Sequence, residues 1–177
     1  MKLAGRVWKY GDGLSATDIV PAPYDPLTLV YDWDRCAEHL FEEHDPGFGR
    51  GAAADDVIIA GHALGAGHAH YHVTAIMACR FRGIGAILCE SADMVFQRAG
   101  IDHGLPVWPV PGIGALFDHG DRIAFDLISG NCRNTTTGIA AQFTPLPPLV
   151  PDILAADSSL DRALARAAAG RQLNPSS

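Results

Sequence analysis

The chain has 177 residues, a length that fits one compact domain spanning residues 1–177. Its formal charge of −7, from 20 acidic and 13 basic side chains, repels phosphate backbones and anionic lipids, so we expect neither nucleic acid nor a membrane as partner. Hydrophobic residues make up 48% of the chain, a slightly apolar composition that leaves room for a subunit interface, including one between copies of this chain.

The sequence contains no apolar run long enough to span a bilayer, and its first ten residues lack the apolar core of a signal peptide. We therefore expect a cytoplasmic protein. The cysteines lie far apart and form no Cys-x-x-Cys pair, which favours buried thiols over a zinc site or a disulfide framework. They are Cys36, Cys79, Cys89 and Cys132.

The first third of the chain predicts one strand followed by irregular structure. Residues 5–10 form a strand-like run that ends at a Gly-Asp-Gly turn. Thr17 and Asp18 follow in a constrained loop before a proline. Over residues 21–51 prolines alternate with aromatic and charged residues, and we interpret this stretch as a mobile arm or lid.

The middle of the chain predicts a parallel α/β unit. Apolar runs at 56–61 and 84–89 indicate buried strands, and helical spacing of apolar residues over 71–82 indicates a helix between them. A strand, a helix and a strand within about 35 residues form a right-handed crossover. A short helix at 94–99 and an edge strand at 105–110 are expected to follow.

The last third predicts a β-hairpin and then helices. Alternation over 122–128, a turn, and β-branched residues within 134–143 indicate the two hairpin strands. Residues 149–156 are expected to form a docked helix. An alanine-rich helix over 160–169 and a frayed tail to residue 177 complete the predicted fold, which is α/β.

The most informative stretch is the glycine-rich loop Gly61-His-Ala-Leu-Gly-Ala-Gly-His-Ala-His-Tyr-His72, between the first core strand and its helix. Ligands of parallel sheets bind at the carboxyl ends of strands, where backbone amides attract anions. We expect the backbone of Gly65, Ala66 and Gly67 to hold a carboxylate or an oxyanion, although close packing of the backbone explains the glycines equally well. The loop matches neither Gly-x-Gly-x-x-Gly nor a phosphate-binding Gly-Lys-Ser/Thr, which disfavours nucleotides.

His68, His70 and His72 add titratable groups to this loop. On a strand they would share one face and could chelate a metal, whereas helical positions two apart diverge by about 200°. Separate roles are therefore favoured over joint chelation, although capping of the helix by one or two of them explains the pattern as well. An imidazole with a pKa of about 6.5 can give or take the proton that an elimination or hydration requires.

Several motifs in order resemble the family of 3-isopropylmalate dehydratase small subunits, which is equivalent to the swivelling domain of the aconitase family. They are Gly5-Arg-Val-Trp-Lys-Tyr-Gly-Asp, Thr17-Asp18-Ile-Val-Pro-Ala-Pro-Tyr24, the Gly65-x-Gly67 loop, Ile84-Gly-Ala-Ile-Leu-Cys-Glu-Ser91, Phe96-x-Arg98-Ala-Gly-Ile-x-x-Gly104-Leu-Pro and Asn134-x-Thr-Thr-Gly138. The resemblance extends from about Gly5 to Ala156.

This resemblance implies a swivelling β/β/α domain that pairs with a larger aconitase-like subunit. The partner would carry a [4Fe-4S] cluster, this chain would bind no metal, and together they would dehydrate or hydrate a small hydroxy acid. Thr17 and Asp18 are expected to hold the loop near the mouth of the substrate site, although an internal turn bond explains them equally well. Tyr24 is expected to contact the substrate or the partner.

The resemblance breaks at the catalytic loop, where the family reads Gly-x-Gly-Ser-Ser-Arg-Glu-His. Here His68, Ala69, His70 and Tyr71 replace the family residues, His72 matches, and the family's Ser-Phe-Ala-Arg becomes Ser91-Ala-Asp-Met94. One imidazole does not reproduce the bidentate grip of an arginine on a carboxylate. We therefore expect a hydroxy acid other than isopropylmalate, with His68 as the base and His70 assisting an oxygen or a single carboxylate.

Two alternatives remain open at this point. One is a non-catalytic or regulatory swivel subunit that docks on a large partner without turnover. The other is a stand-alone metal-binding protein that uses the His-x-His-x-His segment.

Overall fold

The computed structural model describes residues 1–156, 163, 164, 166 and 168. Within this part, the strands are β1 (Lys2–Lys9), β2 (Val57–Ala60), β3 (Ala86–Cys89), β4 (Val107–Pro109), β5 (Arg122–Asp126), β6 (Asn131–Asn134) and β7 (Ala140–Gln142). The helices are α1 (Ala16–Ile19), η1 (Ala22–Val30), α2 (Trp33–Glu38), α3 (Phe48–Gly51), η2 (Ala69–Tyr71), α4 (His72–Phe81), α5 (Met94–Asp102), α6 (Ile113–Leu116) and α7 (Leu149–Ala155), where η marks a 3-10 helix.

The strands form one mixed sheet in the order β4-β3-β2-β1-β5-β6-β7. β1, β2, β3 and β4 run parallel, and β1 pairs with β5 in the antiparallel direction. All residues of β2 and β3 are buried, as expected for strands covered on both faces. The predicted α/β fold with a parallel core is confirmed.

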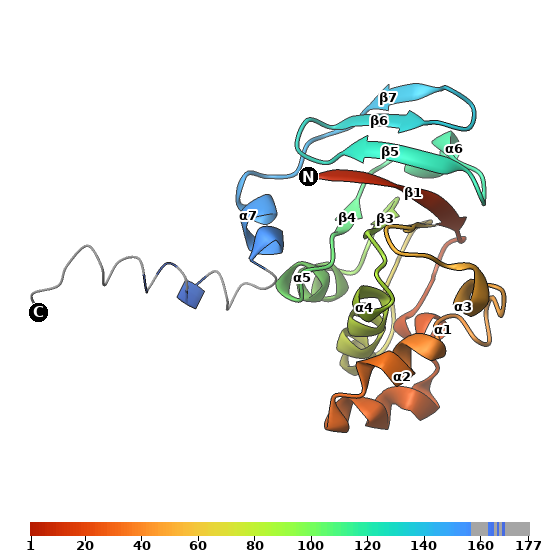
Figure 1. Ribbon diagram of the computed structural model, residues 1–177, viewed down its shortest axis with the longest axis vertical. Coiled ribbons are helices and arrows are strands. Elements are labelled where there is room, and N and C mark those ends of the chain that lie inside the picture. Colours follow the sequence, from red (N-terminus) through yellow and green to blue (C-terminus); the bar gives the residue numbers. More distant parts are fainter. Residues whose placement is uncertain (157–162, 165, 167, 169–177) are drawn as a thin grey trace, which may run out of the picture.

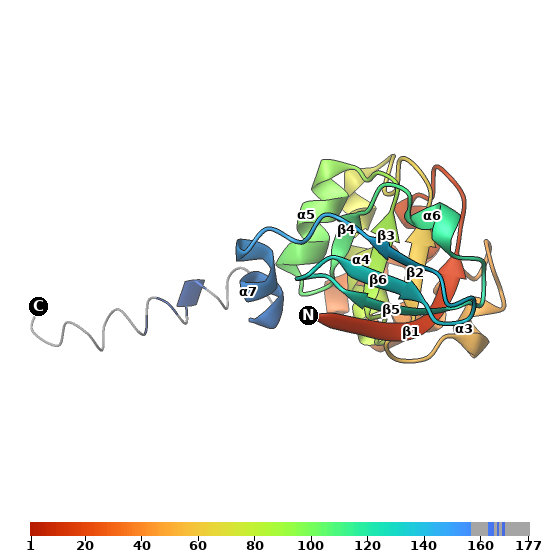
Figure 2. The same ribbon diagram turned by 90° about the horizontal axis from the view of Figure 1, so that it is seen from above.

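Helices α4 and α5 cover one face of the parallel strands, and α2 packs on α4 from outside (Figure 1). Viewed from above, β1, β5 and β6 lie in front of these helices, and α7 stands beside α5 (Figure 2). α4 ends where expected, because Gly83 adopts the left-handed conformation with φ +86° that closes a helix C-terminus.

Apolar side chains fill both faces of the sheet. The first cluster lies under the helices and contains Ile58, Ile76, Ile87 and Phe96, while the second lies on the opposite face with Val57, Leu88, Ile113 and Phe125. Consecutive strand residues enter different clusters because side chains alternate between the faces of a sheet. The sheet is thereby fixed between two apolar layers.

The carboxyl-terminal antiparallel part differs from the predicted hairpin. Three strands, β5, β6 and β7, replace the two that were expected, because residues 131–134 pair with β5 before the chain turns again. The second turn depends on Asn134, whose side-chain oxygen accepts hydrogen bonds from the amides of Thr136 and Thr137 at 3.0 and 3.1 Å. This Asx-type turn reverses the chain within the segment expected to be one strand.

Residues 21–51, predicted as a mobile arm, pack as part of the molecule. Phe41 and Phe48 have no exposed surface, and Cys36 is equally buried. Trp8 meets Phe48 edge to face, with ring centroids 4.8 Å apart. Two of the aromatic residues in this segment, Phe41 and Phe48, are therefore core residues, which explains the departure from the prediction.

The amino terminus is held by an ion pair. The amino terminus lies 3.6 Å from the carboxylate of Asp126, beside the edge of β5. The predicted helix over 160–169 and the tail to residue 177 lie outside the described residues, save for the four positions given above. None of the described helices is long and apolar enough to cross a membrane.

Candidate functional site

The glycine-rich loop leaves the carboxyl end of β2 and is fixed between the connections that follow β1 and β3. The Gly65 amide donates to the Leu14 carbonyl at 2.8 Å, and the Leu64 amide donates to the Ser91 carbonyl at 3.0 Å. The Asp93 amide returns a bond to the Leu64 carbonyl at 2.8 Å. Three connections far apart in the sequence therefore meet at one edge of the sheet, as the parallel arrangement requires.

Gly65 is a position that no other residue fits. Its φ is +76°, and a Cβ there would lie 2.4 Å from Cγ of Phe96. Phe96 lies on α5 and is fully buried. The close approach of loop and helix α5 thus depends on glycine at this point.

The loop residues from Ala66 to His70 are exposed, and this part of the loop presents two imidazoles to solvent. The ring centroids of His68 and His70 lie 5.8 Å apart. Tyr71 packs on His70 at 3.7 Å between centroids. The structure therefore brings the predicted base and its predicted assistant onto the same accessible surface.

His72 differs from the other two histidines and from the prediction that it reacts. It is 2% exposed and begins α4 facing the core, where its ring meets Phe96 edge to face. Its Nε2 lies 2.9 Å from the Gly65 carbonyl, and with Nε2 protonated it donates there. His72 thus holds the loop from below and does not share a surface with His68 and His70.

Fewer backbone amides of the loop are free to bind an anion than the sequence predicted. Two of the three amides that were expected to bind an anion already donate hydrogen bonds within the protein. The Gly65 amide donates to the Leu14 carbonyl, and the Ala66 amide donates to the Ala63 carbonyl at 3.2 Å. Gly67, with φ +113° and open space around its α-carbon, is the remaining member. The turn closes on itself because its own backbone groups satisfy one another.

Thr17 and Asp18 lie on α1, which contacts both η2 and α4. Asp18 accepts hydrogen bonds from the Ser15 amide at 2.8 Å and the Ser15 hydroxyl at 2.7 Å, in a capping box with the Asp18 amide. The Thr17 hydroxyl lies 3.1 Å from that of Ser15. Both residues stand beside the loop, and their polar atoms shape the turn that supports it.

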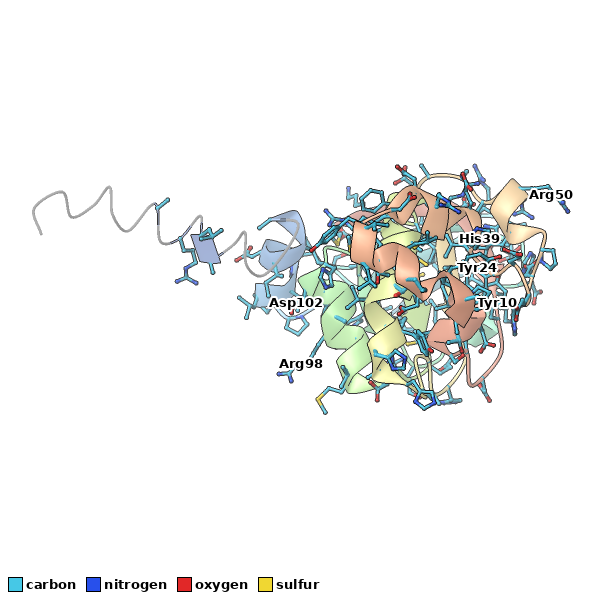
Figure 3. All side chains as sticks on the ribbon, turned by 90° about the horizontal axis from the view of Figure 1, so that it is seen from below. Tyr10, Tyr24, His39, Arg50, Arg98 and Asp102 are labelled. Carbon is cyan, nitrogen blue, oxygen red and sulfur yellow. The ribbon has the colours of Figure 1, made fainter. Side chains whose placement is uncertain are left out.

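Tyr24 is held within its own segment. Its ring stacks on His39 with centroids 3.5 Å apart, and its hydroxyl donates to Glu42 at 3.2 Å. Figure 3 shows Tyr24 and His39 next to each other on the helical side of the molecule. Partial burial, with the Glu42 carboxylate nearby, raises the pKa of the Tyr24 hydroxyl. These contacts do not link Tyr24 to the loop.

Two residues support the loop in a way that the sequence did not predict. The Ser91 hydroxyl accepts a hydrogen bond from the Ala63 amide at 3.0 Å, and Asp12 accepts one from the His62 amide at 2.6 Å. Both follow the end of a parallel strand, at the same sheet edge as the loop. That shared position was a signal available in the sequence.

The three histidines do not converge on a metal. In the part of the chain that the structure describes, no three His, Cys, Asp or Glu side chains are grouped as metal ligands. The cysteines are all buried and unpaired, as predicted, and burial raises the pKa of Cys89 to about 12. Dispersed, protonated thiols do not fit an iron–sulfur cluster, which needs thiolates gathered around it.

Two concavities lie elsewhere on the surface. One of about 630 Å³ lies on the outer face of the antiparallel strands, around Ala4, Ala124 and Arg133. The other, of about 740 Å³, is lined by residues of α2, α3 and the end of α4, among them His39 and Arg82. Neither is lined by the histidine loop, so the chemistry indicated by the sequence lies on an open surface.

Comparisons with known proteins agree on one group of relatives. No protein-family model matches the chain. It is 33% identical over 160 residues to the 3-isopropylmalate dehydratase small subunit of Thermodesulfovibrio yellowstonii, covering 88% of this chain and 90% of that protein. It is 37% identical over 161 residues to the small subunit of Pyrobaculum calidifontis, covering 90% and 96%.

A solved structure shares the fold over almost the entire length. The crystal structure of 3-isopropylmalate dehydratase from Methanocaldococcus jannaschii superposes with a TM-score of 0.87 at 26% identity. The match covers 98% of this chain and all of that one. The chain and this relative therefore have the same architecture.

Proposed function

Because this chain belongs to the family of 3-isopropylmalate dehydratase small subunits, we propose that it is the small subunit of a heteromeric iron–sulfur hydro-lyase that acts on a hydroxy acid. The observation that supports this most directly is the exposed pair His68 and His70, held on a glycine-fixed loop at the carboxyl edge of the parallel strands. A large aconitase-like subunit would cover this surface. Such a partner would hold a [4Fe-4S] cluster, which when bound supplies a Lewis acid for the leaving hydroxyl.

In this proposal His68 is the general base of the dehydration. Its neutral imidazole accepts the proton from the carbon next to a substrate carboxylate, and the electron pair of that C–H bond forms the new C=C bond. The C–O bond on the neighbouring carbon breaks, and the hydroxyl oxygen takes up a proton from solvent and leaves as water, while His68 later releases its own proton to solvent. Hydration is the reverse, with His68 returning its proton to carbon.

The neighbouring residues would orient the substrate. The ring centroid of His70 lies 5.8 Å from that of His68. His70 would donate a hydrogen bond to a substrate oxygen or a single carboxylate, and the Gly67 amide would add a second donor. Thr17 and Asp18 would line the mouth through α1. His72 would act as a positioning residue through the Gly65 carbonyl.

We further propose a substrate other than 3-isopropylmalate. The support is the composition of the loop, in which residues 61–72 include no lysine or arginine. A dicarboxylate held by this chain would have no guanidinium to pair with in the loop. A guanidinium donates two parallel hydrogen bonds to one carboxylate, whereas an imidazole can donate only one to it.

The test is turnover by the complex reconstituted with its large subunit. We expect His68→Ala to lower kcat by at least about 100-fold, the usual contribution of a general base. His62→Ala is the matched control, because His62 is an exposed histidine of the same loop. It should leave kcat within a few-fold of the unchanged complex.

Each other outcome has a distinct meaning. Unchanged turnover in His68→Ala would show that His68 is not the base. A complex that forms but dehydrates no hydroxy acid would favour a regulatory swivel subunit, and failure to bind a large subunit would contradict the proposal as a whole.

A further inference from the structure

The connections at the carboxyl edge of the parallel strands carry acidic side chains but no permanently basic ones. We define this edge by the connections that leave β1, β2, β3 and β4, namely residues 10–19, 61–71, 90–93 and 110–112. These connections contain no lysine or arginine. They contain the acidic residues Asp12, Asp18, Glu90 and Asp93.

The acidic side chains are fixed in place by backbone amides. Asp93 accepts from the amides of Val95 and Phe96 at 2.8 and 3.1 Å. Glu90 accepts from Gly112 and Gly114 at 2.6 and 2.8 Å. Carboxylates held this way cannot swing aside, so a second anion brought to this edge meets them.

The nearest basic side chains in the sequence lie outside these connections. Lys9 ends β1, but its amino group donates to the Phe117 carbonyl at 2.8 Å and lies 3.7 Å from Asp118. Arg98 is one helical turn beyond Met94 on α5, and Figure 3 shows its side chain projecting outward from that helix. At the edge itself, the groups that can become cationic are imidazoles.

Apolar side chains also flank the loop. Leu64 forms a bridge with Ala92, which sets the start of α5 beside the loop. Met94 and Val95 open that helix at 66% and 54% exposure, and Val73 opens α4 at 38%. Exposed apolar side chains next to a reactive loop are suited to contact hydrocarbon.

From this combination we propose that the substrate presents an uncharged, hydrocarbon end to this chain, so that it is a hydroxy acid with one carboxylate instead of two. The inference rests on the proposed function and specifies its substrate class. A second carboxylate placed at the edge would lie among like charges, with no lysine or arginine in the four connections to pair with, and would lose affinity for that reason. A methyl or alkyl group would instead bury surface against Met94 and Val95.

The test compares three substrates in the reconstituted complex. They are 3-isopropylmalate and its two one-carboxylate analogues, in each of which a methyl group replaces one carboxylate. Only the analogue that keeps the carboxylate on the carbon that loses its proton can react by the proposed mechanism, and the other analogue is the unreactive control. We expect kcat/KM for the reactive analogue, which has a methyl group in place of the carboxylate on the hydroxyl-bearing carbon, to exceed that for 3-isopropylmalate by at least about tenfold, the effect of one unpaired charge. A preference for 3-isopropylmalate would overturn this inference and leave the proposed hydro-lyase function standing.

A charge variant tests the role of the edge directly. Met94→Arg adds a guanidinium beside the loop and should shift the ratio of kcat/KM values toward 3-isopropylmalate by about tenfold. The matched control is Ile128→Arg, which places the same charge on an exposed residue of the turn between β5 and β6, at the opposite end of the sheet. We expect that control to leave the ratio unchanged.

The remaining outcomes are decisive as well. If thermal denaturation shows that both variants are folded, equal ratios of kcat/KM in Met94→Arg and Ile128→Arg would overturn the proposal that this edge selects the substrate by charge. A complex that turns over none of the three substrates or any other hydroxy acid would contradict the proposed function, and this inference with it.

Discussion

The histidines at every second position of the loop, His68, His70 and His72, show how far the sequence predicts which side chains are exposed. Their clustering after a buried strand predicted a reactive loop, and His68 and His70 are accessible there. His72 is buried because α4 begins at that residue and turns its ring inward. Sequence patterns place such a boundary only to within a few residues, which is too coarse to decide which histidine faces the core.

The two loop glycines give a prediction for stability. Gly65→Ala would force a Cβ to 2.4 Å from buried Phe96 at a positive φ, whereas Gly67→Ala has the positive φ but open space. We expect the first to lower the free energy of unfolding by about 3 kcal/mol and the second by about 1 kcal/mol. Urea denaturation measures both, and equal losses would contradict the role assigned to the Phe96 contact.

At the scale of elements, the parallel unit was predictable and the antiparallel part was less so. Continuous apolar runs mark β2 and β3, and four-residue strands of this kind have few alternatives between turn signals. β6 has the residues Asn-Cys-Arg-Asn, whose alternation is too short and polar to stand out. Its pairing depends on turns at both ends, and those depend on side-chain contacts that the sequence does not display.

Asp121 at the start of β5 yields a pH prediction. The Asp118 amide at 2.8 Å and the Asn134 side-chain amide at 2.7 Å donate to its carboxylate and lower its pKa. The stabilisation is complete above the unfolded-state pKa of about 3.9 and disappears as pH falls through the lower folded-state pKa. The difference in unfolding free energy between the unchanged protein and Asp121→Asn should therefore shrink below about pH 4.

Chemical denaturation at a series of pH values measures this difference. Asp118→Asn is the control, since it removes a carboxylate from the same turn. The side chain of Asp118 is 94% exposed. A difference for Asp121→Asn that stays constant from neutral to strongly acidic pH would show that the hydrogen bonds do not favour the ionised form.

For the molecule as a whole, one sheet separates two apolar layers, and residues 21–51 complete the first of them. The sequence predicted the layers' helices but not this packing, because prolines and charges there resemble those of a surface loop. Nor did it predict that β1 lies between β2 and β5, since strand neighbours so far apart along the chain leave no local pattern. The fold class was therefore predictable and the completion of its core was not.

A shared sheet predicts that both layers unfold together. Phe48→Ala in the first layer and Phe125→Ala in the second should each lower the unfolding free energy by about 3 to 5 kcal/mol within a single transition. Phe81→Ala, at a residue 49% exposed, is the matched control and should cost much less. Tryptophan fluorescence and circular dichroism should give coincident curves, and separate midpoints in either core variant would contradict this.

The central position of β1 has a consequence for synthesis on the ribosome. Its first neighbour, β2, includes Val57, and its second, β5, ends at Asp126, so one side of the amino-terminal strand has no partner until most of the chain has been translated. At roughly 5 to 20 residues per second, that interval lasts on the order of ten seconds. The nascent polypeptide thus carries an unsatisfied strand edge for that time, a state in which chaperones and neighbouring nascent chains compete to bind it.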